Sequence, residues 1–123
     1  MRYLLMHKLD EAVPGNFEPS PEFLKRMGAY MEEVAKAGIL LAAEGLCKSS
    51  EESARITATK GKKTVTDGPF TETKELIAGF GLIEVRSKEE AVEWAKRFVD
   101  VFTESGLDVE VDVRRVSEGP HEG

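Results

Sequence analysis

Charged side chains gather around one stiff turn near the middle of the sequence. Asp67, Glu72, Lys74 and Glu75 lie within nine residues of one another, beside the turn Asp67-Gly68-Pro69-Phe70. Because glycine accepts a positive φ and proline fixes its own φ, this tetrapeptide predicts a sharp turn that could hold acid–base groups in place. A second interpretation stays open, in which Asp67 accepts backbone N–H bonds from its own turn and the other three side chains face water.

Three further side chains, far apart in the sequence, could join such a site. Glu44 follows the apolar run 39–43, and strand ends are common positions for catalytic groups. Arg55 could pair with Glu44 or Asp67 and orient it, or it could face solvent. His7 follows the apolar run at the start of the chain and could serve as a general base near neutral pH, although a single histidine is more often structural.

The composition excludes several classes of protein. The 123 residues include 17 Lys and Arg against 23 Asp and Glu, a net charge of −6. This charge argues against bulk binding to nucleic acid or to an anionic membrane. Cys47 is the one cysteine, and His7 and His121 are the two histidines, so we expect no disulfide framework, metal site or cofactor, and a reducing cytoplasm fits best. The first apolar run is too short for a signal peptide or a membrane span.

The periodicity of apolar residues predicts one α+β domain over residues 1–116, with a flexible tail at 117–123. Strands are expected at 3–8, 39–43, 79–85 and 109–114, helices at 21–37 and 88–105, and an inserted hairpin at 54–66. Ser20 before Pro21, and Ser87 three residues before Glu90, are typical of helix N-termini. This order indicates a ferredoxin-like fold, with both helices on one face of a largely antiparallel sheet.

Several other features are interpreted as structural. The aromatic residues of the second helix recur at helical spacing and are expected in the core, and Cys47 is expected to pack as a small residue. The lysines around Gly61 are expected to form a solvated hairpin turn. These residues are Trp94, Phe98, Phe102, Lys60, Lys62 and Lys63.

Several segments together resemble the DGPF branch of the YCII-related proteins. They are Glu44-Gly45-Leu46, Val65-Thr66-Asp67-Gly68-Pro69-Phe70, Glu72-Thr73-Lys74-Glu75-Leu76, Gly79-Phe80, and the capped helix with Glu90-Ala91 and Trp94. The resemblance covers nearly the whole chain and implies a bacterial, ferredoxin-like protein that pairs into a dimeric α/β barrel. It also implies a His and Asp pair with an enzymatic role, in which the Asp corresponds to Asp67. The family histidine lies on the first helix, whereas residues 21–37 contain none, so His7 would have to replace it.

Two functions are carried forward from these observations. In the first, a homodimer binds a small polar metabolite in a cleft, with three catalytic candidates and four substrate-binding candidates: Asp67, Glu44 and His7, then Arg55, Lys74, Phe70 and Glu72. In the second, the chain is a non-catalytic regulatory or interaction domain, because family members occur near or fused to sigma factors. A third interpretation is that the motif around Asp67 specifies only folding and dimerisation.

Overall fold

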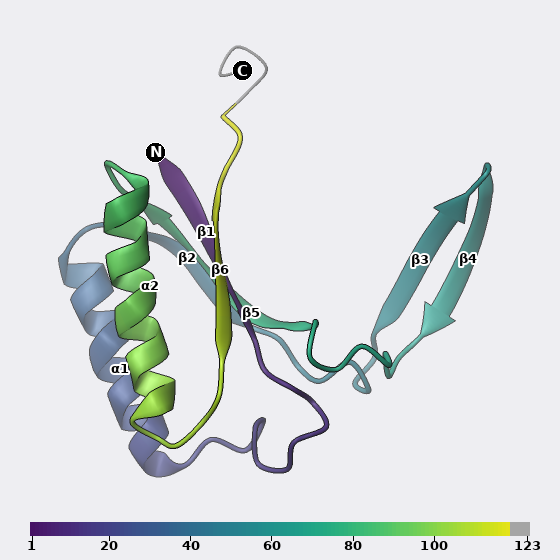
Figure 1. Ribbon diagram of the computed structural model, residues 1–123, viewed down its shortest axis with the longest axis horizontal. Helices are drawn as coiled ribbons and strands as arrows, with labels where there is room; N and C mark the ends of the chain where they lie inside the picture. The colour runs from purple at the N-terminus through teal and green to yellow at the C-terminus, as the bar shows by residue number, and fades with distance from the viewer. Residues whose placement is uncertain (119–123) are drawn as a thin grey trace.

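The computed structural model describes residues 1–118, which form a compact body and a projecting hairpin (Figure 1). The elements run in the order β1 (Arg2–Lys8), α1 (Pro21–Lys36), β2 (Leu40–Gly45), β3 (Ala54–Thr59), β4 (Lys62–Asp67), β5 (Ile77–Glu84), α2 (Lys88–Thr103) and β6 (Glu110–Arg115). Residues 119–123, with His121 and most of the predicted tail, lie outside the described residues. Of the two tail residues within them, Glu118 accepts a hydrogen bond from the backbone N–H of Arg2 at 3.3 Å.

The body is an antiparallel sheet with strand order β2-β5-β1-β6. Both helices cover one face of it (Figure 1). Strands β1 and β2 enclose β5, a split arrangement that is compatible with a ferredoxin-like fold. The predicted α+β class and helix placement are therefore confirmed, while the pairing into a dimeric barrel stays a prediction.

The helices begin where their polar caps predict. The Ser20 hydroxyl accepts a hydrogen bond from the N–H of Phe23 at 3.1 Å, and the Ser87 hydroxyl accepts one from the N–H of Glu90 at 3.1 Å. The Glu90 carboxylate accepts in turn from the N–H of Arg86 at 3.1 Å, one residue before the cap. These bonds satisfy donors that the first helical turn leaves without intrahelical partners.

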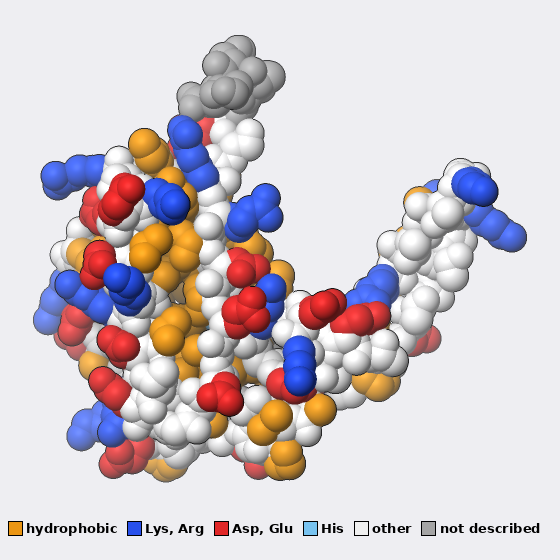
Figure 2. All heavy atoms as spheres, viewed as in Figure 1, with side chains coloured by type: hydrophobic (Ala, Val, Ile, Leu, Met, Phe, Trp, Pro, Cys, Tyr) orange, Lys and Arg blue, Asp and Glu red, His pale blue; other side chains and the backbone are white. Residues whose placement is uncertain are grey.

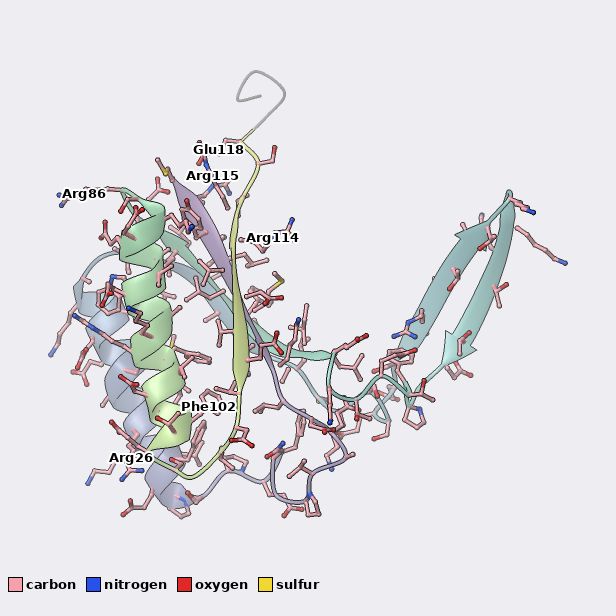
Figure 3. All side chains as sticks on the ribbon, in the orientation of Figure 1. Arg26, Arg86, Phe102, Arg114, Arg115 and Glu118 are labelled. Carbon is pink, nitrogen blue, oxygen red and sulfur yellow. The ribbon has the colours of Figure 1, made fainter. Side chains whose placement is uncertain are left out.

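The core lies between the helices and the sheet. Alternate residues of β1, namely Tyr3 and Leu5, are buried there, together with Val34 of α1 and Phe102 of α2. Figure 3 labels Phe102 near the C-terminal end of α2, on the side of the helix that faces the sheet. The predicted aromatic stripe of this helix is confirmed as part of the core.

The opposite face of the sheet, here called the outer face, is not covered by any described element. Strand register places Leu4 opposite Leu82, and Met6 opposite Phe80, and none of these four belongs to the core beneath the helices. Because side chains alternate along a strand, they form an apolar patch at the centre of the outer face. Arg114 of β6 also points away from the helices (Figure 3).

The inserted hairpin forms a separate two-stranded sheet, and residues 54–67 are here called the arm. Strands β3 and β4 pair only with each other, and every residue in both strands is exposed. Lys60 and Gly61 turn the chain with φ values of 52° and 78°, and glycine tolerates such values at low cost. The arm projects away from the body on the side of the sheet opposite to the helices (Figure 1).

Two details differ from the sequence predictions. Strand β2 continues through Glu44 to Gly45, so that Glu44 lies within the strand and pairs with Phe80. Cys47 is exposed with a free thiol, because it lies in the irregular segment after β2 and not on a buried face. No helix in the described part of the chain is long and apolar enough to cross a membrane.

Candidate functional site

A cavity of about 410 Å³ lies between α1 and the half of the sheet formed by β2 and β5. Its wall on the helical side includes Phe23, Met27 and Tyr30, and its wall on the sheet side includes Leu5 and His7. The lining is mainly apolar, and the volume falls within the range typical of small-molecule sites. The cavity is therefore the first candidate for a binding site in the body.

Glycines on β2 and β5 keep this cavity open. Gly45 and Gly81 line it, and a Cβ atom built on either residue would meet no atom within 4 Å. At Gly79 a Cβ would collide with the His7 ring and lie 2.8 Å from the carbonyl oxygen of Glu44. Gly79 therefore admits the imidazole, while the other two glycines leave empty space that longer side chains would fill.

His7 is the titratable side chain on the sheet side of the cavity. Its ring centroid lies 5.1 Å from that of Phe98 and 5.7 Å from that of Phe102, so the imidazole packs against α2. Burial lowers the pKa of His7 from 6.5 to about 4, because an apolar environment disfavours the charged form. His7 is therefore neutral at pH 7 and can exchange a hydrogen bond with a bound molecule without offering it a positive charge.

Glu44 reaches the cavity differently from His7. It lines the cavity and its carbonyl oxygen faces Gly79. The register pairs Glu44 with Phe80 and Phe80 with Met6, so pleating directs the Glu44 side chain to the outer face, whereas His7 faces the helices. The strand places the two residues at one cavity but their side chains on opposite faces of the sheet.

The other predicted site residues gather at the base of the arm and do not line this cavity. The Arg55 guanidinium lies 3.2 Å from the Glu72 carboxylate and stacks over the Phe70 ring at 4.2 Å. The predicted pairing of Arg55 with Glu44 or Asp67 is wrong, because Arg55 points to the polar face of the arm, next to Glu72. A hydrogen bond from its own backbone, followed by the Arg55 interaction, holds the pKa of Glu72 below its usual range.

Lys74 lies near Asp10, in the loop that follows β1. A hydrogen bond from the Thr73 side chain, then one from the N–H of Ala12, and more weakly the charge of Lys74, hold the pKa of Asp10 below its usual range. The chain after the turn is thus attached to the loop after β1. Within the described chain, the seven predicted site residues therefore divide between two regions.

Asp67 ends β4 with an exposed side chain, and no hydrogen bond to its carboxylate occurs among the described residues. The Asx-type turn considered for Asp67 is therefore not formed. The backbone N–H of Phe70 donates instead to the Ser49 hydroxyl at 3.0 Å, and the N–H of Gly68 donates to the Ser53 carbonyl at 2.9 Å. A Cβ atom on Gly68 would collide with the Ser49 carbonyl oxygen, which explains the glycine at this position.

Ser49 and Glu11 hold this turn, and the two residues together with Gly68 and Phe70 are here called the clasp. The Glu11 carboxylate accepts hydrogen bonds from the Ser49 backbone N–H at 2.7 Å and from the Ser49 hydroxyl at 2.6 Å. Ser49 is the buried polar residue of the described chain, with 6% of its surface exposed. The sequence analysis missed Ser49 and Glu11, because neither lies in a pattern that distinguishes it from the polar residues around it.

No group of three potential metal-ligating side chains occurs among residues 1–118. What the described side chains can do is bind an apolar molecule against a neutral imidazole in the cavity. At the clasp they fix the turn from which the arm projects. The arrangement therefore separates a candidate binding region from a structural one.

Comparison with known proteins matches this chain to a family model and to an uncharacterised relative. The family model of the YCII-related domain matches residues 1–117 and so spans both the body and the arm. An uncharacterised protein of Rhizobium meliloti (strain 1021) is 31% identical over 98 residues, which cover 78% of this chain and 78% of that protein. The predicted resemblance is confirmed at the level of the YCII-related domain, while the DGPF branch stays a prediction.

Proposed function

This chain belongs to the YCII-related domain family, and the relative that matches it is uncharacterised, so we propose a function from the geometry of the chain itself. We propose that it is a homodimer that binds a small molecule in the cavity beside His7. The single observation that supports this proposal is the apolar cavity of about 410 Å³ with an imidazole in its wall. The expected ligand has an apolar body and one hydrogen-bonding group. It is less polar than the metabolite predicted from the charges around Asp67.

The proposed role of His7 is to orient this ligand. A neutral imidazole can donate or accept one hydrogen bond, and such a bond contributes about 0.5–1.5 kcal/mol to binding. The acid–base roles of Asp67, Glu44 and His7 stay predictions, as do the substrate contacts of Arg55, Lys74, Phe70 and Glu72.

Titration with 2-naphthol, a neutral bicyclic molecule with one hydroxyl group, tests the proposal. Gly81→Leu fills empty space in the cavity and is expected to weaken binding at least tenfold. Gly28→Leu is the matched control, because Gly28 is exposed on α1 and its Cβ would also meet no neighbour. Equal affinity of 2-naphthol for both variants, or no saturable binding to the unmodified chain, would overturn the proposal.

His7→Phe separates the role of the imidazole from that of the cavity. This variant should bind 2-naphthol about 2–10-fold more weakly, which is the loss of one hydrogen bond. Naphthalene, which lacks the hydroxyl, should bind both forms with similar affinity. A similar loss for both molecules would indicate that Phe changes the cavity shape and that His7 does not orient the ligand.

The homodimer in this proposal is supported by the outer face of the sheet. Leu4, Met6, Phe80 and Leu82 form an apolar patch that no described element covers, and such patches in soluble proteins often mark interfaces. Sedimentation at micromolar concentration should give a dimer, and Phe80→Glu should give a monomer that remains folded. A monomeric unmodified chain would contradict the dimer but not the cavity.

The second candidate is a regulatory or interaction domain that contacts a protein such as a sigma factor. The exposed arm is the observation that favours it, because a hairpin without a covering layer is a natural contact surface. Sedimentation of the chain mixed with a purified sigma factor should then give a complex that 2-naphthol does not affect. Saturable 2-naphthol binding and no complex would favour the first proposal.

A further inference from the structure

The arm has one face with an apolar centre and one polar face. Register pairs Ile56 with Val65 at the centre of the first face. Ala54 and Ala58 lie on the same face, each opposite a charged residue, Asp67 at the base and Lys63 near the tip. The polar face carries Arg55, Thr57, Thr59, Lys62, Thr64 and Thr66. A hairpin with this pattern is expected to lay its apolar face on another surface.

The arm's own body does not provide that surface. Ile56 is 68% exposed and Val65 is 65% exposed, although β-branched apolar residues at the centre of a sheet are ordinarily covered. An isolated two-stranded hairpin is marginally stable in water, and additional strands or packing are needed for a stable sheet. The clasp attaches the arm at its base only, so the covering surface must belong to another molecule.

The charges of the two regions are complementary. The arm carries four basic side chains and one acidic side chain, a net charge of +3, and since the whole chain carries −6 the remainder carries −9. Figure 2 shows lysines at the tip of the arm and acidic side chains on the body, along β6 and near the base of the arm. Glu110 and Asp112 of β6 lie in the register of the outer face, where Lys8 forms ion pairs with them at 3.9 and 3.0 Å.

The position of the arm fits a second copy of this chain. The arm lies on the side of the sheet away from the helices (Figure 1), which is the side of the outer face. A second sheet packed on the outer face would therefore lie beside the arm. In a dimer with two-fold symmetry, each arm would meet the acidic body of the other copy.

We propose that the arm is an exchange arm, which lays Ile56 and Val65 on the body of a second copy of this chain and brings its basic tip to acidic side chains there. The inference rests on the homodimer of the proposed function and adds a second contact to it. In this dimer, the second copy would cover both the outer face and the centre of the arm.

A pair of double variants with equal charge tests the arm. Ile56→Glu with Val65→Glu places two carboxylates on the apolar face, and Thr57→Glu with Thr64→Glu places two on the polar face of the same hairpin. The first should raise the dimer dissociation constant at least about 100-fold, because it removes two apolar contacts and buries charge. The second should raise it only a few-fold. Circular dichroism checks that the body of each variant remains folded.

Each outcome of sedimentation on these variants decides one point. Equal dissociation constants for the two double variants would overturn the exchange arm. If Phe80→Glu still dissociated the dimer in that case, the proposed homodimer would stand, with the outer face as its interface. A monomeric unmodified chain would remove the homodimer and the arm contact together. If the arm instead binds heparin or a protein while the dimer is unchanged by Ile56→Glu with Val65→Glu, the arm serves a different partner and the proposal is wrong.

Discussion

The body and the arm are built from similar strands but obtain their stability in different ways. In the body, Tyr3 and Leu5 of β1 and Ile83 of β5 are buried against two helices, so hydrophobic burial adds to the hydrogen bonds of the sheet. In the arm, the same kind of antiparallel pairing has no buried residue on either face. The comparison indicates that backbone pairing sets the shape of a hairpin, while its stability depends on a layer that covers one of its faces.

The candidate binding residues and the exposed charged residues lie in different regions. The body holds the cavity and a histidine whose pKa burial lowers to about 4, whereas the charged side chains of the 67–75 segment remain near water at the base of the arm. Four predictions test this division, from the largest expected effect to the smallest.

Removal of a buried aromatic ring from the body should have the largest effect on folding. Phe102 is 2% exposed, and Phe102→Ala should lower the free energy of unfolding by about 3–5 kcal/mol, because it leaves a cavity and removes apolar burial. Ile56→Ala in the arm should change it by about 0.5 kcal/mol or less, as for other exposed positions. Urea unfolding at concentrations where the chain is monomeric measures both. Similar losses would contradict the contrast between the regions.

Lowering the pH should destabilise the body through His7. Because the folded pKa lies below the unfolded value of 6.5, the unfolded chain binds the proton more readily, so stability is complete above pH 6.5 and falls as the pH drops to about 4. The loss from this group is about 3 kcal/mol at most. His7→Phe should flatten the difference in unfolding free energy between pH 7 and pH 4. Equal slopes in the two proteins would show that His7 does not titrate in this range.

Loss of the Ser49 hydroxyl should loosen the clasp. Ser49→Ala removes the acceptor for the Phe70 N–H and one donor to Glu11, and an unsatisfied buried group costs about 1–3 kcal/mol. Limited proteolysis should then cut within residues 54–70 faster than in the unmodified chain. Ser50→Ala is the matched control, because Ser50 is exposed and adjacent. Equal cleavage rates for the two variants would show that the clasp does not hold the arm.

Neutralising the exposed ion pair beside the clasp should have the smallest effect. Glu72→Gln removes the charge that faces Arg55, yet both side chains are more than 40% exposed, and exposed ion pairs contribute little to stability. The urea midpoint is expected to remain within experimental error of that of the unmodified chain. A clear shift would show that the Arg55 pair, and not Ser49, determines the attachment of the arm.

Much of the fold followed from patterns of neighbouring residues. Three of these patterns are local: the N-caps at Ser20 and Ser87, the alternation in β6 and the hairpin turn at Gly61. The structure confirms all three. The sequence predicted that β2 ends before Glu44, whereas the strand continues to Gly45. The end of this edge strand is set by its pairing with β5, which the spacing of residues does not reveal. Cys47 was placed wrongly for the same reason, since its exposure depends on how the segment after β2 leaves the sheet.

The candidate site was less predictable than the fold. Sequence analysis grouped Asp67, Glu72 and Lys74 because they are close in the chain, and Arg55, from a distant part of the sequence, joins Glu72 in the structure. It could not place His7 in a cavity, because the cavity lies between α1 and two glycines on different strands, Gly45 of β2 and Gly81 of β5. Ser49 was missed because its partners, Glu11 and Phe70, are distant in the sequence.

The sequence by itself determined the order of the elements, their class, the family and the stiff turn at Gly68-Pro69, because these depend on residue types and on contacts between near neighbours. The tertiary structure decided which faces are buried, where the empty space lies and which residue holds the turn. Those features depend on distant segments that meet in space, as Gly79 meets His7 and Gly68 meets Ser49. They also depend on what fails to meet, since no described segment covers Ile56 and Val65 of the arm. The physical reason for the difference is that burial and close packing act between residues that are near in space, whatever their separation in the sequence.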